Sequence, residues 1–214
     1  MSLGLILLMA LAVLVLFGVG ERVLDRMRLN DRQALLVIAA IFIGGLLPDI
    51  ALGPVRVNIG GAIIPFILCV YLLVRAGTHK ERIRALAASV LTGVSVYLLG
   101  RFTPGDPTQI SFDPNYLYGL LGGAIAYILG RSRRASFVAA VLGVLGADIA
   151  LGVINFASGL DQTLRLGSAG ALDVVVISGL LAVLLCEIVG EILERMQNGA
   201  AHDNGYVATG RRRK

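Results

Sequence analysis

Charged residues are scarce in this chain, and tryptophan is missing altogether. Only 15% of the residues are Asp, Glu, Lys or Arg, whereas 57% are hydrophobic. Soluble domains contain about 25% charged residues, so this composition excludes an ordinary soluble enzyme. Tryptophan often anchors membrane proteins at the lipid interface, and here tyrosines would have to serve instead. The candidates are Tyr116, Tyr118 and Tyr127.

Residues for common soluble chemistry are also few. Cys69 and Cys186 both fall inside apolar stretches, and their spacing is not that of a disulfide framework or a metal site. The sequence has no nucleotide-binding glycine loop and no Ser/His nucleophile pair. Basic residues lie between apolar segments and do not form a run typical of nucleic-acid binding. We therefore expect no metal, no cofactor and no nucleic-acid partner.

Long apolar runs predict an all-α, polytopic bundle of transmembrane helices. A helix needs about 20 mainly apolar residues to cross a membrane. The predicted integral membrane domain covers 1–196, and the polar, glycine-rich stretch 197–214 is expected to be a disordered basic cytoplasmic tail. We predict seven spans at 3–19, 34–53, 57–75, 85–100, 116–130, 135–157 and 168–190.

The basic residues orient these spans. With seven spans, 16 of the 19 Lys and Arg residues fall on one side of the membrane, and only Arg56, Arg101 and Arg165 fall on the other. Positive charge is retained on the cytoplasmic side. The pattern therefore predicts a multi-pass protein of the cell membrane, with its N-terminus outside and its C-terminus in the cytoplasm.

A short sequence occurs twice. Asp-Ile-Ala-Leu-Gly stands at 49–53 and again at 148–152, and a glycine-rich segment follows each copy, at 58–65 and 166–173. The pattern predicts a parallel three-plus-one-plus-three repeat, as in some carriers. The two units would cover about 1–75 and 114–190, with 85–100 as the linker helix.

Three aspartates stand inside the predicted spans, namely Asp49, Asp148 and Asp173. A carboxylate in the middle of a membrane helix costs about 2.5–3.5 kcal/mol, so such residues usually have a function. With a rise of about 1.5 Å per residue, the three lie at similar depths near the outer surface. Asp148 and Asp173 would face each other from adjacent antiparallel helices, where two carboxylates can share a proton.

The segment from Gly170 to Ser178, Gly-Ala-Leu-Asp-Val-Val-Val-Ile-Ser, resembles the Gly-x-Gly-Asp stretch of intramembrane aspartyl proteases of the presenilin and signal-peptide-peptidase type. The resemblance implies that Asp148 and Asp173 are catalytic and cut a transmembrane peptide within the membrane. Gly167, Gly170 and Ser178 would support them. Leu172 departs from the motif, because the second glycine stands there in those families.

The pattern as a whole, with Asp-Ile-Ala-Leu-Gly and the segment Gly-Ser-Ala-Gly-Ala-Leu-Asp at 167–173, also resembles a prokaryotic multi-pass family, domain of unknown function 1614. That resemblance implies a membrane location and no established activity.

Two alternatives stay open. The first is a proton- or cation-coupled carrier of small solutes, similar in plan to the SWEET sugar carriers. Asp49 and Asp148 would then be equivalent pathway acids, Pro48 and Pro65 hinges, and Asn58 a solute ligand. The second is a non-catalytic scaffold whose aspartates cap helix ends, with membrane lipids as its surroundings. The oligomeric state is left open.

Overall fold

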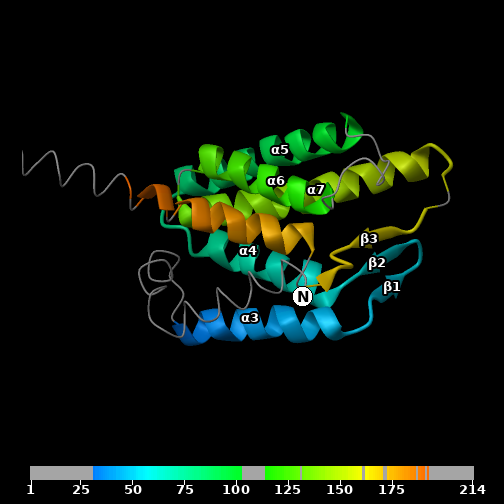
Figure 1. Ribbon diagram of the computed structural model, residues 1–214, viewed down its shortest axis with the longest axis horizontal. Coiled ribbons are helices and arrows are strands. Elements are labelled where there is room, and N and C mark those ends of the chain that lie inside the picture. Colours follow the sequence, from blue (N-terminus) through cyan, green and yellow to red (C-terminus); the bar gives the residue numbers. More distant parts are fainter. Residues whose placement is uncertain are drawn as a thin grey trace, which may run out of the picture.

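The computed structural model describes residues 31–102, 114–130, 132–160, 162–170, 173–186, 188–190 and 192, and these are mostly helical (Figure 1). The predicted first span, 3–19, and the tail 197–214 lie outside the described residues. In chain order the elements are α3 (Asp31–Leu46), β1 (Ile50–Leu52), β2 (Val55–Val57), the π-helical turn η1 (Ile59–Ile63), α4 (Ile64–Val74), α5 (His79–Phe102), α6 (Pro114–Gly130), α7 (Arg133–Ala157) and β3 (Leu164–Leu166). Another helix, called helix 174–190 below, runs over Val174–Gly190.

Helix α7 packs closely against its neighbours because the contacting residues are small. Most residues in its first half are buried. A Cβ added to Gly143 would lie 2.8 Å from the Cβ of Thr92 in α5, and one added to Gly93 would lie 2.9 Å from the carbonyl oxygen of Gly143. The hydroxyl of Ser89 reaches across to the carbonyl oxygen of Val138 at 3.4 Å. Such small-residue contacts are typical of helices that pack in lipid.

The two longest helices begin at capping residues. The backbone N–H of Glu81 donates to the hydroxyl of Thr78, and the Glu81 carboxylate accepts from the N–H of Gly77. This reciprocal arrangement satisfies donors that a helix start leaves free. At the start of α7, the hydroxyl of Ser132 accepts from the N–H of Ala135. Local sequence therefore fixes where α5 and α7 begin.

A three-stranded sheet lies at one end of the bundle, so the expectation of an all-α fold is wrong. Strands β1 and β2 form an antiparallel hairpin, whose turn contains Gly53 at a φ of 62°. Strand β3 joins β2 in parallel, so that Arg56 is opposite Arg165. The helix ends at Leu46, seven residues before the end of the predicted span 34–53, and the reason lies in the local sequence. The residue before a proline avoids the helical conformation, and α3 ends just before Leu47 and Pro48.

Glycines join the sheet to the bundle at a point that we call the glycine junction, made of Gly45, Gly60, Gly61, Gly167 and Gly170. A Cβ on Gly61 would collide with the carbonyl oxygen of Gly167, and one on Gly170 would come within 2.8 Å of the Cα of Gly45. Gly167 and Gly170 both have positive φ angles, 68° and 60°. Only glycine allows backbones to approach this closely in these conformations.

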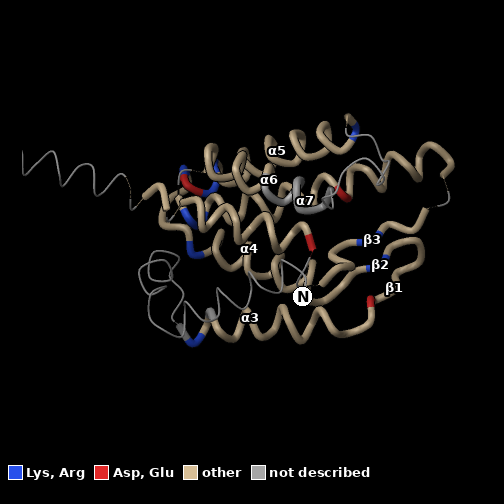
Figure 2. Tube along the Cα trace, in the orientation of Figure 1, with Lys and Arg blue, Asp and Glu red and all other residues tan. Residues whose placement is uncertain are grey.

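A group of basic residues lies at the end of the bundle away from the sheet (Figure 2). At the end away from the sheet, the guanidinium groups of Arg82, Arg84 and Arg134 donate to backbone carbonyls at the C-terminal ends of α4 and α6, at 3.0–3.4 Å. Arg134 also forms a salt bridge with Glu81 at 3.3 Å. Cations near the C-terminal ends of helices are favourable because unpaired carbonyls make those ends negative.

Two of the described helices, α5 and α7, are long and apolar enough to cross a membrane. They contain the predicted spans 85–100 and 135–157. The predicted spans 57–75, 116–130 and 168–190 correspond to shorter apolar helices, Ile59–Val74, α6 and helix 174–190. Large apolar side chains such as Ile43, Ile67 and Val90 are 59–66% exposed. Extended apolar surface of this kind marks a site of contact with membrane lipid or with another protein.

Candidate functional site

Asp49 does not lie in a helix. It stands between α3 and β1, and its carboxylate accepts a hydrogen bond from the side-chain amide of Asn58 at 3.0 Å. Asn58 is 2% exposed, and its side-chain oxygen accepts from the N–H groups of Gly60 and Gly61 at 2.9 and 3.0 Å. Its backbone N–H donates to Leu166 in β3. Asn58 therefore joins the Asp49 carboxylate to the start of η1 and to the sheet.

Asp173 precedes helix 174–190, whereas the sequence predicts it several residues inside a span. One carboxylate oxygen accepts from the N–H of Val175 at 3.0 Å, and the other accepts from the N–H of Ala169 at 3.2 Å. The backbone carbonyl of Asp173 accepts from Ile177. Asp173 is thus the N-cap of its helix, a position in which aspartate is common. The two backbone donors fix the direction of its carboxylate.

Asp148 lies within α7, as the sequence predicts, and it is partly buried. It lines a hollow of about 190 Å³ between the last turns of α7 and the segment that leads into β3. Asn155 donates to the side chain of Gln162 at 3.1 Å on the wall of this hollow. The other lining residues are Leu151, Gly152, Thr163, Leu164 and Arg165. Asp148 therefore faces a polar space at the sheet end of the molecule.

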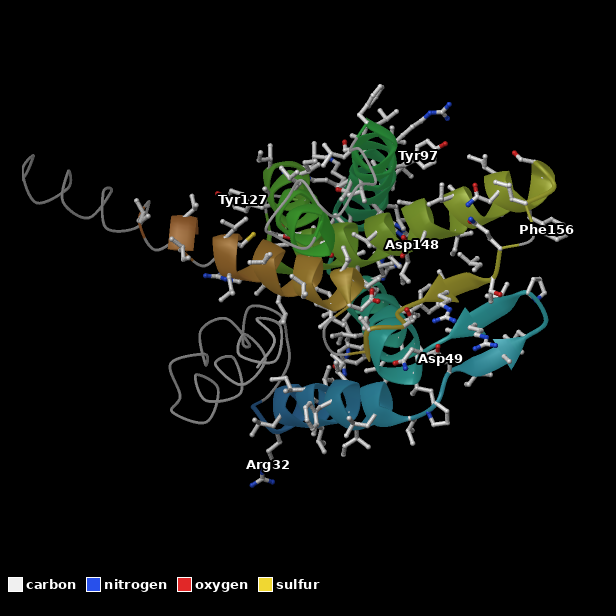
Figure 3. The ribbon with its side chains drawn as sticks, turned by 45° about the vertical axis from the view of Figure 1, so that its right-hand side comes forward. Arg32, Asp49, Tyr97, Tyr127, Asp148 and Phe156 are labelled. Carbon is white, nitrogen blue, oxygen red and sulfur yellow. The ribbon has the colours of Figure 1, made fainter. Side chains whose placement is uncertain are left out.

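The three aspartates share one end of the bundle but not one environment. Asp148 is within electrostatic range of Asp173, and no direct hydrogen bond joins these two carboxylates in the part of the chain described. Asp49 is engaged by Asn58. Figure 3 shows Asp49 beside the strands and Asp148 on α7, with Arg32 at the far end of α3. The structure thus relates Asp148 to Asp173 more closely than to Asp49.

The supporting residues divide into two groups. Gly167 and Gly170 belong to the glycine junction and shape the turn that carries Asp173. Ser178 is fully buried, and its hydroxyl donates to the carbonyl of Val175 at 3.1 Å, so it faces its own helix. Pro65 is buried in the first turn of α4, which continues directly from η1. Pro48 is exposed and lies just beyond α3.

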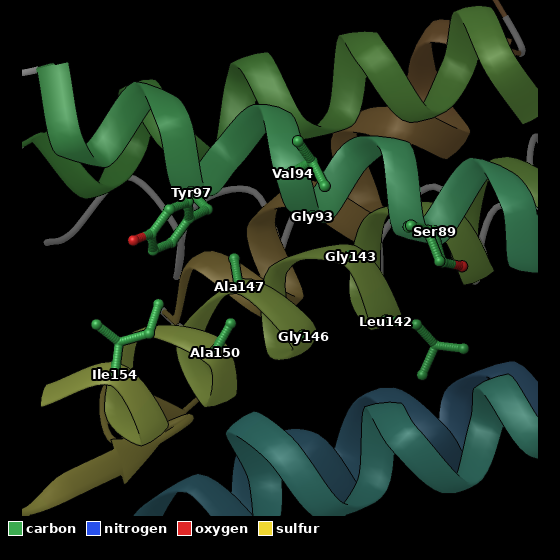
Figure 4. Close-up of a pocket in the computed structure, with 11 residues that line it drawn as sticks. Ser89, Gly93, Val94, Tyr97, Leu142, Gly143, Gly146, Ala147, Ala150 and Ile154 are labelled. Carbon is green, nitrogen blue, oxygen red and sulfur yellow. The ribbon is translucent and has the colours of Figure 1, made fainter. Parts of the chain in front are cut away.

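A groove that was not predicted from the sequence lies between α5 and α7 (Figure 4). It has a volume of about 350 Å³, and Ser89, Gly93 and Tyr97 line it on one side while Gly146 and Ala150 line it on the other. The small residues at regular helical spacing were its signal. Within the described ranges, no group of three or more His, Cys, Asp or Glu side chains could hold a metal ion.

These features define a mostly helical protein with membrane-type helices and a small sheet at one end. Residues 25–185 match the profile of the family described as protein of unknown function (DUF1614), and the chain belongs to this family. The match confirms the family expected from the repeated pentapeptide and the glycine-rich segment. Comparisons with curated proteins and with solved structures gave no match.

Proposed function

We propose that this protein is an integral protein of the cell membrane that crosses it seven times, with the sheet end outside. Three observations support this proposal, and the second of them gives the orientation. Helices α5 and α7 have the length and composition of spans. The arginines after α4 and before α7 gather at the end opposite the sheet, where the positive-inside rule would place the cytoplasm. The exposed faces of the helices are apolar.

In this proposed membrane protein, Asp148 and Asp173 form a catalytic pair that hydrolyses peptide bonds in the membrane. The observation that carries this proposal is that the Asp148 carboxylate interacts electrostatically with that of Asp173, while Asp148 lines a polar hollow and backbone donors hold Asp173 at the start of its helix. Two carboxylates in such a place can hold one proton between them. Backbone donors orient Asp173, and each of its oxygens keeps a second acceptor site for water or substrate.

The chemistry requires no other group. The ionised carboxylate removes a proton from water as the water oxygen bonds to the scissile carbonyl carbon, and the protonated carboxyl group donates its proton to the carbonyl oxygen. The resulting diol then expels the amine. The carboxyl group that took a proton from water gives it to the nitrogen as the carbon–nitrogen bond breaks, and the other carboxylate takes the proton of one diol hydroxyl as the new carboxyl group forms. The pair returns to its singly protonated form.

The test uses purified protein in proteoliposomes with single-span peptides, and cleavage is read by mass spectrometry. Asp148→Asn and Asp173→Asn should each abolish cleavage, whereas Asp49→Asn should retain it in protein that remains folded. Cleavage that survives either of the first two substitutions would exclude the catalytic pair. Reporter fusions at Gly77 and Gln162 test the orientation, since they should report the cytoplasm and the outside, respectively.

A proton-coupled carrier is the second candidate, and one observation favours it. The hollow beside Asp148 is lined by Asn155, Gln162, Thr163 and Arg165, which together offer donors and acceptors to a small polar solute. As equivalent acids of a duplicated carrier, Asp49 and Asp148 should have matching surroundings, and they differ in this structure. In the same proteoliposomes, a carrier would show proton-linked uptake that Asp49→Asn and Asp148→Asn impair equally.

A further inference from the structure

The pentapeptide Asp-Ile-Ala-Leu-Gly adopts two structures within this one chain. At 49–53 it forms strand β1 and the hairpin turn, and at 148–152 it forms part of α7. Its five residues are identical in the two places. The sequence is therefore compatible with both conformations, and its surroundings select between them.

The strands that follow the two copies pair with each other in a matching register. Val55, Arg56 and Val57 lie opposite Leu164, Arg165 and Leu166, respectively. On one side, β2 carries the first pentapeptide as its antiparallel partner β1. Strand β3 occupies the other end of the strand order, and in the described residues no strand pairs with its outer edge. The second pentapeptide lies close to that strand, since a Cβ on Gly152 would lie 2.7 Å from the Leu164 side chain.

The last turns of α7 pack less against the rest of the chain than its first half does, because the buried residues of α7 all lie between 135 and 147. Leu151, Val153 and Phe156 are 49%, 60% and 72% exposed, and the last turns project beside the sheet (Figure 1). A helix of 25 residues is about 37 Å long, which exceeds the roughly 30 Å hydrocarbon core. When its start lies at the inner interface, about its last five residues, 153–157, stand beyond the lipid core, where backbone groups can bond to water. Asp148, Leu151 and Gly152 lie deeper, but they line the polar hollow, where non-helical backbone is also tolerated.

Gly152 is compatible with a second conformation as well as with the helix. Its counterpart, Gly53, has a φ of 62° in the hairpin turn, whereas Gly152 is not among the glycines with positive φ. A glycine inside a helix costs about 1 kcal/mol relative to alanine. The approach of the Leu164 side chain gives only a partial reason for it, because that side chain is flexible.

From these observations we infer that the segment Asp148–Ala157 can leave α7, and that Ile149–Leu151 then pair with the free edge of β3. By analogy with β1 and β2, Ile149 would lie opposite Leu166, Ala150 opposite Arg165, and Leu151 opposite Leu164. The sheet would gain a fourth strand in the order β1, β2, β3, 149–151. Ala150 would leave the groove beside α5, and Asp148 would move away from Asp173.

Cross-linking distinguishes the two states, because Ala150 lines the groove while Arg165 lines the separate hollow. The test introduces cysteines at both positions, in a Cys69→Ala/Cys186→Ser background, and measures the rate of disulfide formation in liposomes. The pair Ala51→Cys/Arg56→Cys, already opposite each other, is the positive reference. The pair Asp148→Cys/Arg165→Cys is the matched control, because both residues line the hollow when the segment is helical, whereas the proposed sheet places Ala150 opposite Arg165.

We expect the 150/165 pair to form a disulfide about tenfold faster than the control pair. A 150/165 rate equal to that of the control, with the reference pair reacting normally, overturns the inference.

A second measurement needs no variant. In the unmodified protein, backbone amides of 149–157 should exchange hydrogen at least about tenfold faster than those of 135–147. Equal protection of the two halves of α7 would also overturn the inference. Neither readout depends on catalysis, so the proposed protease activity can fail without affecting this result.

Discussion

The two copies of Asp-Ile-Ala-Leu-Gly differ in what surrounds them. Pro48 precedes the first copy and Pro54 follows it, and prolines exclude helical continuation on both sides. The second copy has Ala147 before it and Val153 after it, and α7 continues through all five residues. The comparison indicates that flanking residues bias the same five residues toward strand or helix. It also explains why Asp49 and Asp148 have different partners.

The sharpest way to break this comparison is to give the second copy the proline of the first. Ala147→Pro should lower the free energy of unfolding by about 3 kcal/mol or more, because it removes a helix hydrogen bond and places a ring at a buried position. Denaturant unfolding in detergent measures this. Ala147→Ser, which keeps the backbone N–H, is the control and should change stability by about 1 kcal/mol or less. Equal losses of stability in the two variants would show that a proline before the second copy has no particular effect on its helix.

The next largest effect concerns the first copy alone. Asn58→Leu should cost about 2–3 kcal/mol, since the N–H groups of Gly60 and Gly61 and the Asp49 carboxylate lose their partner. Asn155→Leu is the matched control, because its bond to Gln162 is exposed, and it should cost less than about 0.5 kcal/mol. Melting temperatures of the two variants provide the measurement. A smaller loss for Asn58→Leu would mean that Asn58 does not hold the sheet end.

The aspartates themselves sharpen the comparison. Asp49→Asn should destabilise the protein by about 1 kcal/mol, because a charge-assisted hydrogen bond from Asn58 becomes a neutral one. Asp148→Asn should leave stability unchanged or raise it, since a partly buried carboxylate close to that of Asp173 is replaced by a neutral amide. Unfolding of both variants under one condition gives the difference. The reverse order would indicate that Asp148 has a structural role.

The smallest effect concerns glycine. Gly53→Ala should cost about 1 kcal/mol, because Gly53 has a left-handed φ of 62°. Gly146→Ala should instead stabilise α7 by about 0.5–1 kcal/mol, since a Cβ there would meet no atom within 4 Å. The melting temperature should fall in Gly53→Ala and rise in Gly146→Ala. Loss of stability in both variants would argue against a regular helix at Gly146.

Much of the helical part of the molecule follows from sequence alone. Apolar runs located α5 and α7, and the resemblance at the pentapeptide and the segment 167–173 led to the family. The small sheet was not predicted, although Pro48 and Pro54 and the alternating segments Val-Arg-Val and Leu-Arg-Leu carried a signal for it. In so apolar a sequence, long hydrophobic runs predict helices everywhere. Strands of only three residues are too short to show a distinct alternation within such runs.

The sequence by itself determined the apolar character of the chain, its helix starts at Thr78 and Ser132, and the end of α3 before Pro48, because each depends on composition or on immediate neighbours. Only the tertiary structure decided that β2 pairs with a strand about a hundred residues further along the chain. It also decided that Asp49 is bound by Asn58 while Asp148 lies near Asp173. Such pairings depend on how closely glycine backbones approach each other, and that distance is set by the packing of whole helices.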